Sequence, residues 1–348
     1  MRGITVIPKQ KGSAELSEVP EPRTGDGDVL IEAVAVGVCG TDEEIVEGLY
    51  GWPPPGRERL VLGHESLGRV AEAPPGGALS PGDLVMAMVR HADPVPCPNC
   101  AIDEWDMCRN GRYTEHGIKE VDGFDRERYR LPADRLVPVN PALGFLGVLT
   151  EPTSIVAKAW EHLDRIGARA RWEPRHVLVT GAGPVGLLAA MIGVQRGLEV
   201  CVLDRVTEGP KPELVGALGA RYATDIEEVG HGFDVVVEAT GVGALAFHAL
   251  RHVEANGVVA LTGLSGSDRI LKVEADHLNQ SLVLRNVALF GSVNANRRHY
   301  EQAARALAAA DHGWLERLIT RRVPLDKWNE ALEHRPDDVK TVIEFGES

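Results

Sequence analysis

The chain has 348 residues, more than one hydrophobic core usually organises, so its length favours two domains. Hydrophobic residues make up 44% and charged residues 25% of the sequence, which excludes a chain too polar to fold. The formal net charge of -14 opposes binding to nucleic acid or to anionic lipid. The start, MRGITVIPKQKG, lacks a signal-peptide pattern, and no stretch approaches the roughly 18 apolar residues of a membrane span. We therefore expect a cytoplasmic protein that binds neither nucleic acid nor membrane.

The first part of the chain, to about residue 149, predicts short strands separated by Gly, Pro and Asp. Strand candidates lie at residues 28–38, 67–73, 83–89 and 129–139. Such spacing is typical of an antiparallel barrel or sandwich.

From about residue 151 the pattern changes. An apolar helix is predicted over 153–163, and later strands alternate with Ala- and Leu-rich helical stretches. The strand candidates are nearly continuous apolar runs at 176–181, 198–204, 233–241, 257–263 and 288–293. This alternation predicts a parallel sheet with helices on both faces. A helix is predicted over 299–310, and the terminal KTVIEF is a strand candidate that would rejoin the first domain.

The sequence HVLVTGAGPVGLLAA places Gly181, Gly183 and Gly186 in G-x-G-x-x-G register between a strand and a helix. The first glycine permits a tight turn, the second lets the backbone approach a pyrophosphate, and the third lets helix and strand pack closely. This context favours a dinucleotide site over a plain glycine-rich turn. Asp204 ends the next strand, where an acid hydrogen-bonds the adenosine ribose of NAD. Arg205 follows it and would instead suit the 2′-phosphate of NADP, so both cofactors stay open with NAD favoured.

Cys39 ends a predicted strand, and His64 with Glu65 follows another. A thiolate, an imidazole and a carboxylate are ligand types of a catalytic zinc, which keeps one position open. Taken singly, a lone Cys is usually a small buried hydrophobe and a His-Glu pair a surface turn. Their joint presence favours the metal site.

The segments CGTD and GHE, with the glycine motif downstream, resemble the zinc-containing medium-chain alcohol dehydrogenase family, and most closely its glucose 1-dehydrogenase branch. The resemblance runs nearly end to end. It implies an α/β protein with a GroES-like β-rich catalytic domain and a Rossmann domain built on a doubly wound parallel sheet. The implied boundaries are 1–155 with 300–348 for the catalytic domain and 156–299 for the Rossmann domain.

The resemblance also implies a catalytic zinc held by Cys39, His64 and either Glu65 or Glu151, where Glu151 has helix capping as its alternative role. The zinc would bind the substrate hydroxyl and lower its pKa before hydride passes to the nicotinamide. Thr41 corresponds to the hydroxyl that relays the proton in this family.

A second cluster, within PVPCPNCAIDEWDMC, comprises Cys97, Cys100 and Cys108. It matches the last three cysteines of the family's structural zinc site and has Pro94 where the first should stand. The fourth ligand would be Asp106, or else Asp93 or Asp103. A metal-free loop is the alternative. Thiols crowded in this way suit metal binding in a reducing compartment better than a disulfide framework.

In the glucose dehydrogenase branch the positions of Glu115 and Asn294 contact sugar hydroxyls, and Thr41 and Glu151 complete the implied substrate set. The resemblance therefore predicts oxidation of an aldose at its anomeric hydroxyl, with D-glucose giving gluconolactone as the first choice. A solvated loop charge and a strand end are the ordinary alternatives for Glu115 and Asn294.

The implied cofactor contacts are Gly181, Gly183, Pro184, Val185, Gly186, Asp204, Arg205, Thr240, Gly241, Val293 and Lys340. An exposed strand lysine is the alternative for Lys340. Relatives form homodimers or homotetramers, so we expect one of these.

Three other functions compete with glucose oxidation. The first is the same chemistry on another sugar, a polyol or a secondary alcohol such as L-threonine. The others are a zinc-free quinone reductase and a noncatalytic NADPH-binding homologue, and both predict that no metal is bound.

Overall fold

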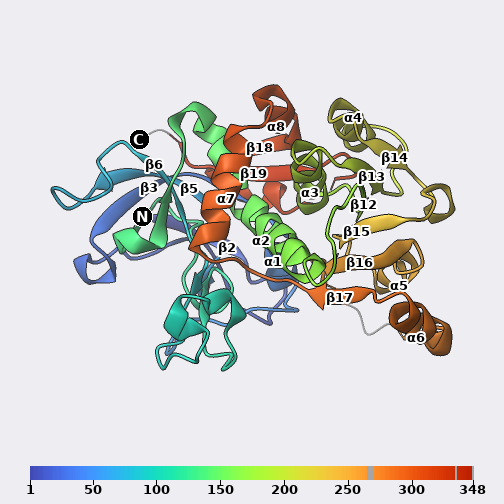
Figure 1. Cartoon of the computed structure of the whole chain (residues 1–348). Coiled ribbons are helices and arrows are strands. Elements are labelled where there is room, and N and C mark those ends of the chain that lie inside the picture. Colours follow the sequence, from blue (N-terminus) through green and yellow to red (C-terminus); the bar gives the residue numbers. More distant parts are fainter. Residues whose placement is uncertain (265–269, 334, 347–348) are drawn as a thin grey trace. The chain divides into compact units, whose positions relative to one another are not determined.

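The structure is a computed structural model that describes residues 1–264, 270–333 and 335–346 (Figure 1). Contacts between Cα atoms divide the chain into two compact units. Unit 1 comprises Met1–Glu151, Asn294–His312 and Ile319–Ser348. Unit 2 comprises Pro152–Val293 and Gly313–Leu318. The helix α2 (Thr150–Gly167) begins in unit 1 and continues into unit 2.

Unit 1 is rich in β-structure. Its strands are β1 (Arg2–Val6), β2 (Glu15–Glu18), β3 (Val29–Gly37), β4 (Leu60–Val61), β5 (Glu65–Glu72), β6 (Leu84–Ala87), β7 (Arg90–His91), β8 (Thr114–His116), β9 (Glu120–Val121), β10 (Arg128–Leu131), β11 (Leu136–Pro138), β18 (Ile319–Pro324) and β19 (Lys340–Glu344). Its helices include α1 (Gly40–Val46), α7 (Arg297–Ala308) and α9 (Trp328–Ala331). The main sheet has the order β11-β6-β5-β3-β19-β18, with β10 also paired to β3. The smaller sheets are β2-β1-β4 and β7-β8-β9.

The main sheet of unit 1 confirms the antiparallel pattern predicted for the first part of the chain. Along β3, buried residues alternate with partly exposed ones, as expected for a strand with one face on the core. β3 pairs antiparallel with β5 and with β19, so the terminal strand does rejoin this sheet. The strand predicted over 129–139 is instead two strands, β10 and β11, because Pro132 cannot donate to a ladder and the chain turns there.

Unit 2 contains a six-stranded parallel sheet of order β14-β13-β12-β15-β16-β17. Its strands are β12 (His176–Thr180), β13 (Glu199–Leu203), β14 (Arg221–Ala223), β15 (Phe233–Glu238), β16 (Val253–Leu261) and β17 (Ala288–Gly291). Its other helices are α3 (Pro184–Gln195), α4 (Pro210–Ala217), α5 (Gly243–Ala249), α6 (Ala275–Leu284) and most of α8 (His312–Leu318). The predicted parallel sheet is confirmed. β14 was missed because its three residues, Arg-Tyr-Ala, carry no apolar run.

The apolar runs of unit 2 form its core. Val177, Val179, Val235, Val237 and Val259 are fully buried. β17 is the edge strand at one end of this sheet, and its residues are only partly buried. Among the helices of the described residues, none has the length and apolar character needed to cross a membrane.

Candidate functional site

The first group of candidate ligands lies where β3 and β5 meet. Cys39 is the residue before α1, two residues after β3 ends, and His64 immediately precedes Glu65, the first residue of β5. The strand register pairs Gly37 with Glu65, so the end of one strand meets the start of the other. One ligand atom from each of Cys39, His64 and Glu65 lies within 4.8 Å of the other two. His64 and Glu65 are buried, and Cys39 is half-buried.

Asp42 organises this group, and its role was not predicted from the sequence. Its Oδ1 lies 3.3 Å from Nδ1 of His64, and its Oδ2 accepts a 2.9 Å hydrogen bond from the backbone N–H of Cys39. Burial opposes protonation of His64, but the charge and hydrogen bond of Asp42 outweigh it and raise the His64 pKa well above its usual value. A carboxylate that fixes one imidazole nitrogen presents the other nitrogen to a metal. The sequence signal was the CGTD spacing, in which residue 42 caps residue 39.

Lys340 and Glu151 complete what we call the Cys39 centre, which comprises Cys39, Asp42, His64, Glu65, Glu151 and Lys340. Lys340 forms a buried ion pair with Glu65 and donates a 2.8 Å hydrogen bond to the carbonyl of Val38. Burial, followed by the charge of Glu65, raises the pKa of Glu151 to about 8. A Cβ at Gly37 would lie 2.2 Å from Oε2 of Glu65, so this ion pair needs glycine there.

The Cys39 centre fits a divalent metal. It brings a thiol, an imidazole and two carboxyl groups into one buried cluster, the donor set that zinc accepts in catalytic sites. Burial and the charge of Glu65 disfavour the ionised form of Glu151, and a cation would relieve that cost. Thr41 lies half-buried on α1, two residues beyond Cys39.

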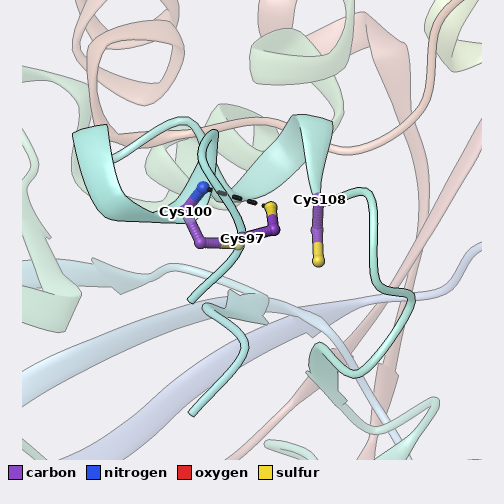
Figure 2. Close-up of side chains that lie close together, drawn as sticks. All are labelled: Cys97, Cys100 and Cys108. Carbon is purple, nitrogen blue, oxygen red and sulfur yellow. Dashed lines mark hydrogen bonds between the residues drawn. The ribbon is translucent and has the colours of Figure 1, made fainter. Parts of the chain in front are cut away.

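The second group consists of Cys97, Cys100 and Cys108, whose sulfur atoms lie within 4.8 Å of one another (Figure 2). They belong to what we call the cysteine loop, residues 93–110, which contains the 3-10 helices Cys100–Ile102 and Trp105–Met107. Sγ of Cys97 accepts backbone hydrogen bonds from Arg109 at 3.4 Å and Cys100 at 3.5 Å. These bonds lower the pKa of Cys97 to about 6, whereas burial raises the pKa of Cys100 to about 11. Cys97 therefore carries thiolate character, as a metal ligand should.

The acids considered as a fourth ligand of the cysteine loop have other contacts. Asp106 accepts a 2.9 Å hydrogen bond from Nδ2 of Asn296. Asp93 accepts from Asn110 Nδ2 at 2.7 Å and from the backbone of Val95 at 2.8 Å. Asp103 is exposed, and its backbone has a left-handed conformation with φ of 61°. The three thiols form a group without any of these carboxylates.

The two predicted sugar contacts, 179 residues apart in sequence, lie together. Nδ2 of Asn294 donates a 2.8 Å hydrogen bond to Oε1 of Glu115. Both residues are buried, and Arg90 donates to the same oxygen from Nε at 3.0 Å and lies 2.9 Å from it at Nη2. Glu115 is therefore an ion-paired buried acid, which excludes the solvated loop charge. Arg90 was not singled out in the sequence, where a lone Arg at a strand start carries no signal.

The glycine turn of unit 2 has the geometry that a dinucleotide needs. Gly181 has φ of 96°, and a Cβ on Gly186 would lie 1.9 Å from the carbonyl oxygen of Gly181, so only glycine fits there. Gly183 caps α3 and has open space around its Cα. Pro184 and Val185 form the first turn of this helix, whose N-terminus suits a pyrophosphate.

The carboxylate of Asp204 accepts hydrogen bonds from two backbone N–H groups of unit 2. Its Oδ2 accepts a 2.7 Å hydrogen bond from the backbone of Ala182 in the glycine turn, and Oδ1 accepts from the backbone of Val206 at 3.1 Å. Lys211 lies 3.8 Å from Oδ2, and Arg205 is exposed beside it. The acid is thus partly neutralised and committed to its own turn.

The remaining predicted cofactor contacts in unit 2 lie in two places. A Cβ on Gly181 would lie 2.9 Å from Cγ2 of Thr240, so Thr240 borders the glycine turn. Glu238 holds the following turn by accepting from the backbone of Thr240 at 2.8 Å and of Gly241 at 3.1 Å. Val293 has an exposed side chain, and its carbonyl accepts from Nζ of Lys158 at 2.9 Å.

Comparison with known proteins identifies the family. A model described as an alcohol dehydrogenase GroES-like domain matches residues 25–141, and one described as a glucose dehydrogenase C-terminus matches residues 144–345. A glucose 1-dehydrogenase of Methanocella arvoryzae is 41% identical across 99% of this chain and 100% of its own length. The chain belongs to the glucose dehydrogenase family.

Membership of the glucose dehydrogenase family confirms the resemblance seen in the sequence. The glucose 1-dehydrogenase of Thermoproteus tenax is also 41% identical over 99% of both chains. Among solved structures, a glucose dehydrogenase of Haloferax mediterranei "in complex with NADP, Zn and gluconolactone" matches with a TM-score of 0.92 and 32% identity over the full length of both chains. This match confirms the predicted α/β fold with a GroES-like domain and a Rossmann-type parallel sheet.

Proposed function

We propose that this protein is a zinc-dependent glucose 1-dehydrogenase, which transfers a hydride from the anomeric carbon of D-glucose to NADP+ or NAD+ and yields gluconolactone. The observation that carries the proposal is that the Cys39 centre and the buried Glu115–Asn294 pair lie in the same compact unit. Family membership and the contents of the Haloferax mediterranei structure support the choice of substrate.

Cys39 and His64, with Glu65 or Glu151, would hold the zinc. When bound, the ion supplies a Lewis acid that polarises the sugar hydroxyl and lowers its pKa. Asp42 orients the imidazole of His64 for metal binding, because its carboxylate lies beside Nδ1 and leaves the other ring nitrogen for the metal. Lys340 neutralises the charge of Glu65. The raised pKa of Glu151 favours this residue as the carboxyl group that can gain or lose a proton when the metal or substrate binds.

Proton release from the substrate hydroxyl is assigned to Thr41. Its hydroxyl is two residues from Cys39, on the same helical turn as Asp42. The family's usual histidine further along is replaced by Glu44, which is half-buried. The outer part of the relay therefore differs in this chain.

Glu115 and Asn294 would bind the sugar hydroxyls. Within the described ranges of the chain, the side-chain hydrogen bonds to Glu115 all end on Oε1, which leaves Oε2 to accept from a hydroxyl. A buried acid and amide that lose their bonds when a hydroxyl is missing discriminate strongly against the wrong substrate.

The nicotinamide cofactor would lie on the glycine turn of unit 2 and accept the hydride. The commitment of Asp204 to Ala182 and Lys211, with Arg205 exposed beside it, supports NADP as the better cofactor. This reverses the preference for NAD that the sequence suggested.

A second zinc is proposed in the cysteine loop, held by Cys97, Cys100 and Cys108. The thiolate character of Cys97 and the convergence of the sulfurs support it. Such a site organises its loop and contributes no chemistry. Unbridged thiols of this kind also support a cytoplasmic location.

The protein is also proposed to be a homodimer or homotetramer. The edge strand β17 and the preceding helix expose large apolar side chains: Val283 is 64%, Leu284 78% and Leu289 41% exposed. An exposed strand edge with apolar side chains favours pairing with a second copy.

The test is metal analysis coupled to an aldose panel. The purified protein is assayed on glucose, galactose, xylose, sorbitol and L-threonine with both cofactors, before and after dialysis against a strong chelator. We expect glucose to be preferred and activity to follow the metal content. Negligible turnover of every aldose would contradict the substrate, and full activity in verified metal-free protein would contradict the metal.

A further inference from the structure

Five buried polar residues of unit 1 are joined into a closed ring by four hydrogen bonds and by the backbone of residues 294–296, and we call this the polar ring. Arg90 donates from Nε to Glu115 at 3.0 Å, and Nη1 of Arg90 donates to the backbone carbonyl of Asp106 at 3.2 Å. Oδ1 of Asp106 accepts from Asn296 at 2.9 Å. Asn294, two residues from Asn296, closes the ring by donating to Glu115 at 2.8 Å.

The polar ring is buried. Its members are 2% to 7% exposed, so water cannot replace a lost partner. A buried polar group that loses its partner retains the full cost of desolvation, which makes the bonds of such a ring depend on one another. Asn294 has φ of 61°, and its own Oδ1 accepts from the backbone of Ala295 at 2.7 Å. In this conformation of segment 294–296 the Nδ2 groups of both asparagines donate within the ring.

We propose that Asp106 is a positioning residue of the sugar site and not a ligand of the cysteine-loop metal. The proposal rests on the proposed function, because the sugar site is that of Glu115 and Asn294. Asp106 holds Asn296 with its carboxylate and Arg90 with its carbonyl, so it fixes the two arms that end on the Glu115–Asn294 pair.

The contacts of Asp106 argue against metal ligation. The three thiols converge without it, although it lies only two residues before Cys108. Its Oδ1 is directed to an amide on the segment before α7. Turning this carboxylate toward the sulfur atoms would break the bond to Asn296 and leave that buried amide without its acceptor.

The position of Asp106 also connects the cysteine loop to substrate binding. The cysteine loop contains both the three converging thiols and Asp106, which is a member of the polar ring. Any change that moves residues 105–108 is therefore expected to change affinity for the sugar before it changes the chemical step, since the Cys39 centre is not in the ring.

Three variants test the proposal: Asn296→Asp, Asp106→Asn, and the double variant that carries both. Asn296→Asp places two carboxylates against each other. We expect the KM for glucose to rise about tenfold with kcat within about twofold, since a lost bond to a charged group has this magnitude. In the double variant the amide at position 106 can donate to the carboxylate at position 296, so the hydrogen bond is restored in the opposite direction. It should bring KM back to within about threefold of the parent.

The metal content of Asp106→Asn separates the two roles of this residue. A positioning role predicts that the variant keeps the metal content of the parent enzyme. Loss of one ion per chain would overturn the proposal, as would an unchanged KM in Asn296→Asp. The matched control is Glu104→Gln, which breaks the ion pair of Glu104 with Arg298, another contact between the cysteine loop and α7, but leaves the ring intact. It should leave KM unchanged.

The outcome remains decidable if glucose is not the substrate. In that case the parent enzyme itself fails the assay, which identifies the proposed function as wrong. The ring is then judged on metal content and thermal midpoint. A double variant more stable than Asn296→Asp supports the pairing, and additive losses contradict it.

Discussion

The Cys39 centre and the cysteine loop both offer thiol ligands to a metal, but they balance charge in different ways. In the loop, the thiolate of Cys97 is stabilised by backbone N–H groups only 3 and 12 residues away. In the centre, the acid Glu65 is paired with Lys340, a residue 275 positions further along the chain. A closed site can therefore be built from local backbone, whereas the Cys39 centre is assembled by strand pairing across the whole unit.

The largest expected effect lies at the centre. Cys39→Ser removes the thiolate ligand, and we expect kcat/KM for glucose to fall by about a thousandfold or more, since the metal supplies several kcal/mol of charge stabilisation. Steady-state kinetics and metal analysis measure it. The loop should keep its metal, and a variant that retains parental activity would break the distinction between the two sites.

Asp42 has the next largest expected effect. Asp42→Asn keeps the shape of the side chain but loses the charge that holds Nδ1 of His64. Loss of such a supporting carboxylate should weaken metal affinity or activity about 10- to 100-fold. Competition with a chelator of known affinity measures this directly. Unchanged metal affinity would show that the imidazole is oriented by other groups.

In the cysteine loop the expected effect is on stability. Cys108→Ser removes one of three converging thiols. We expect the thermal midpoint to fall by about 5 °C, because a structural metal contributes folding free energy. The kcat should change by no more than about threefold. Scanning calorimetry and kinetics on the same preparation test this, and a loss of kcat as large as that of Cys39→Ser would remove the contrast.

A pH dependence is also expected beside the loop. Burial lowers the pKa of His91 to about 4 and that of His116 well below its usual value, and their Nε2 atoms lie 2.7 Å apart. Between pH 6.5 and about 4 the unfolded chain therefore binds more protons than the folded chain. Acidification through this range should lower the free energy of unfolding by up to about 1.4 kcal/mol per pH unit for each histidine.

Denaturant unfolding between pH 7 and 4 measures that slope, with His91→Gln as the comparison variant. The variant should lose stability less steeply with acid than the parent chain. Equal slopes would mean that His91 titrates alike in both states.

Much of the fold could be predicted because its signals are local. The apolar runs of unit 2 and the glycines at 181, 183 and 186 set a parallel sheet and its first turn within single segments. The division of residues 129–139 into two strands, and the short β14, were missed because a three- or four-residue strand carries too little pattern.

The candidate ligands could be chosen from the sequence because thiol, imidazole and carboxylate are few and chemically distinct. The residues that support these ligands could not be chosen from the sequence in the same way. Arg90 and Asn296 act through contacts between segments up to 190 residues apart, which no spacing encodes. For Asp42 the CGTD spacing indicates only the cap on Cys39, and its contact with His64 depends on strand register. The hydrogen bond from the backbone of Ala182 to Asp204 likewise joins separate segments, so the sequence did not indicate it.

The central claim is that Cys39 and His64 share one metal ion in the working enzyme. Anomalous diffraction from crystals of the active protein, recorded on both sides of the zinc absorption edge, tests it most directly. We expect a zinc peak about 2.3 Å from Sγ of Cys39 and about 2.1 Å from a ring nitrogen of His64. Crystals of fully active protein with no anomalous peak between these two side chains would contradict it.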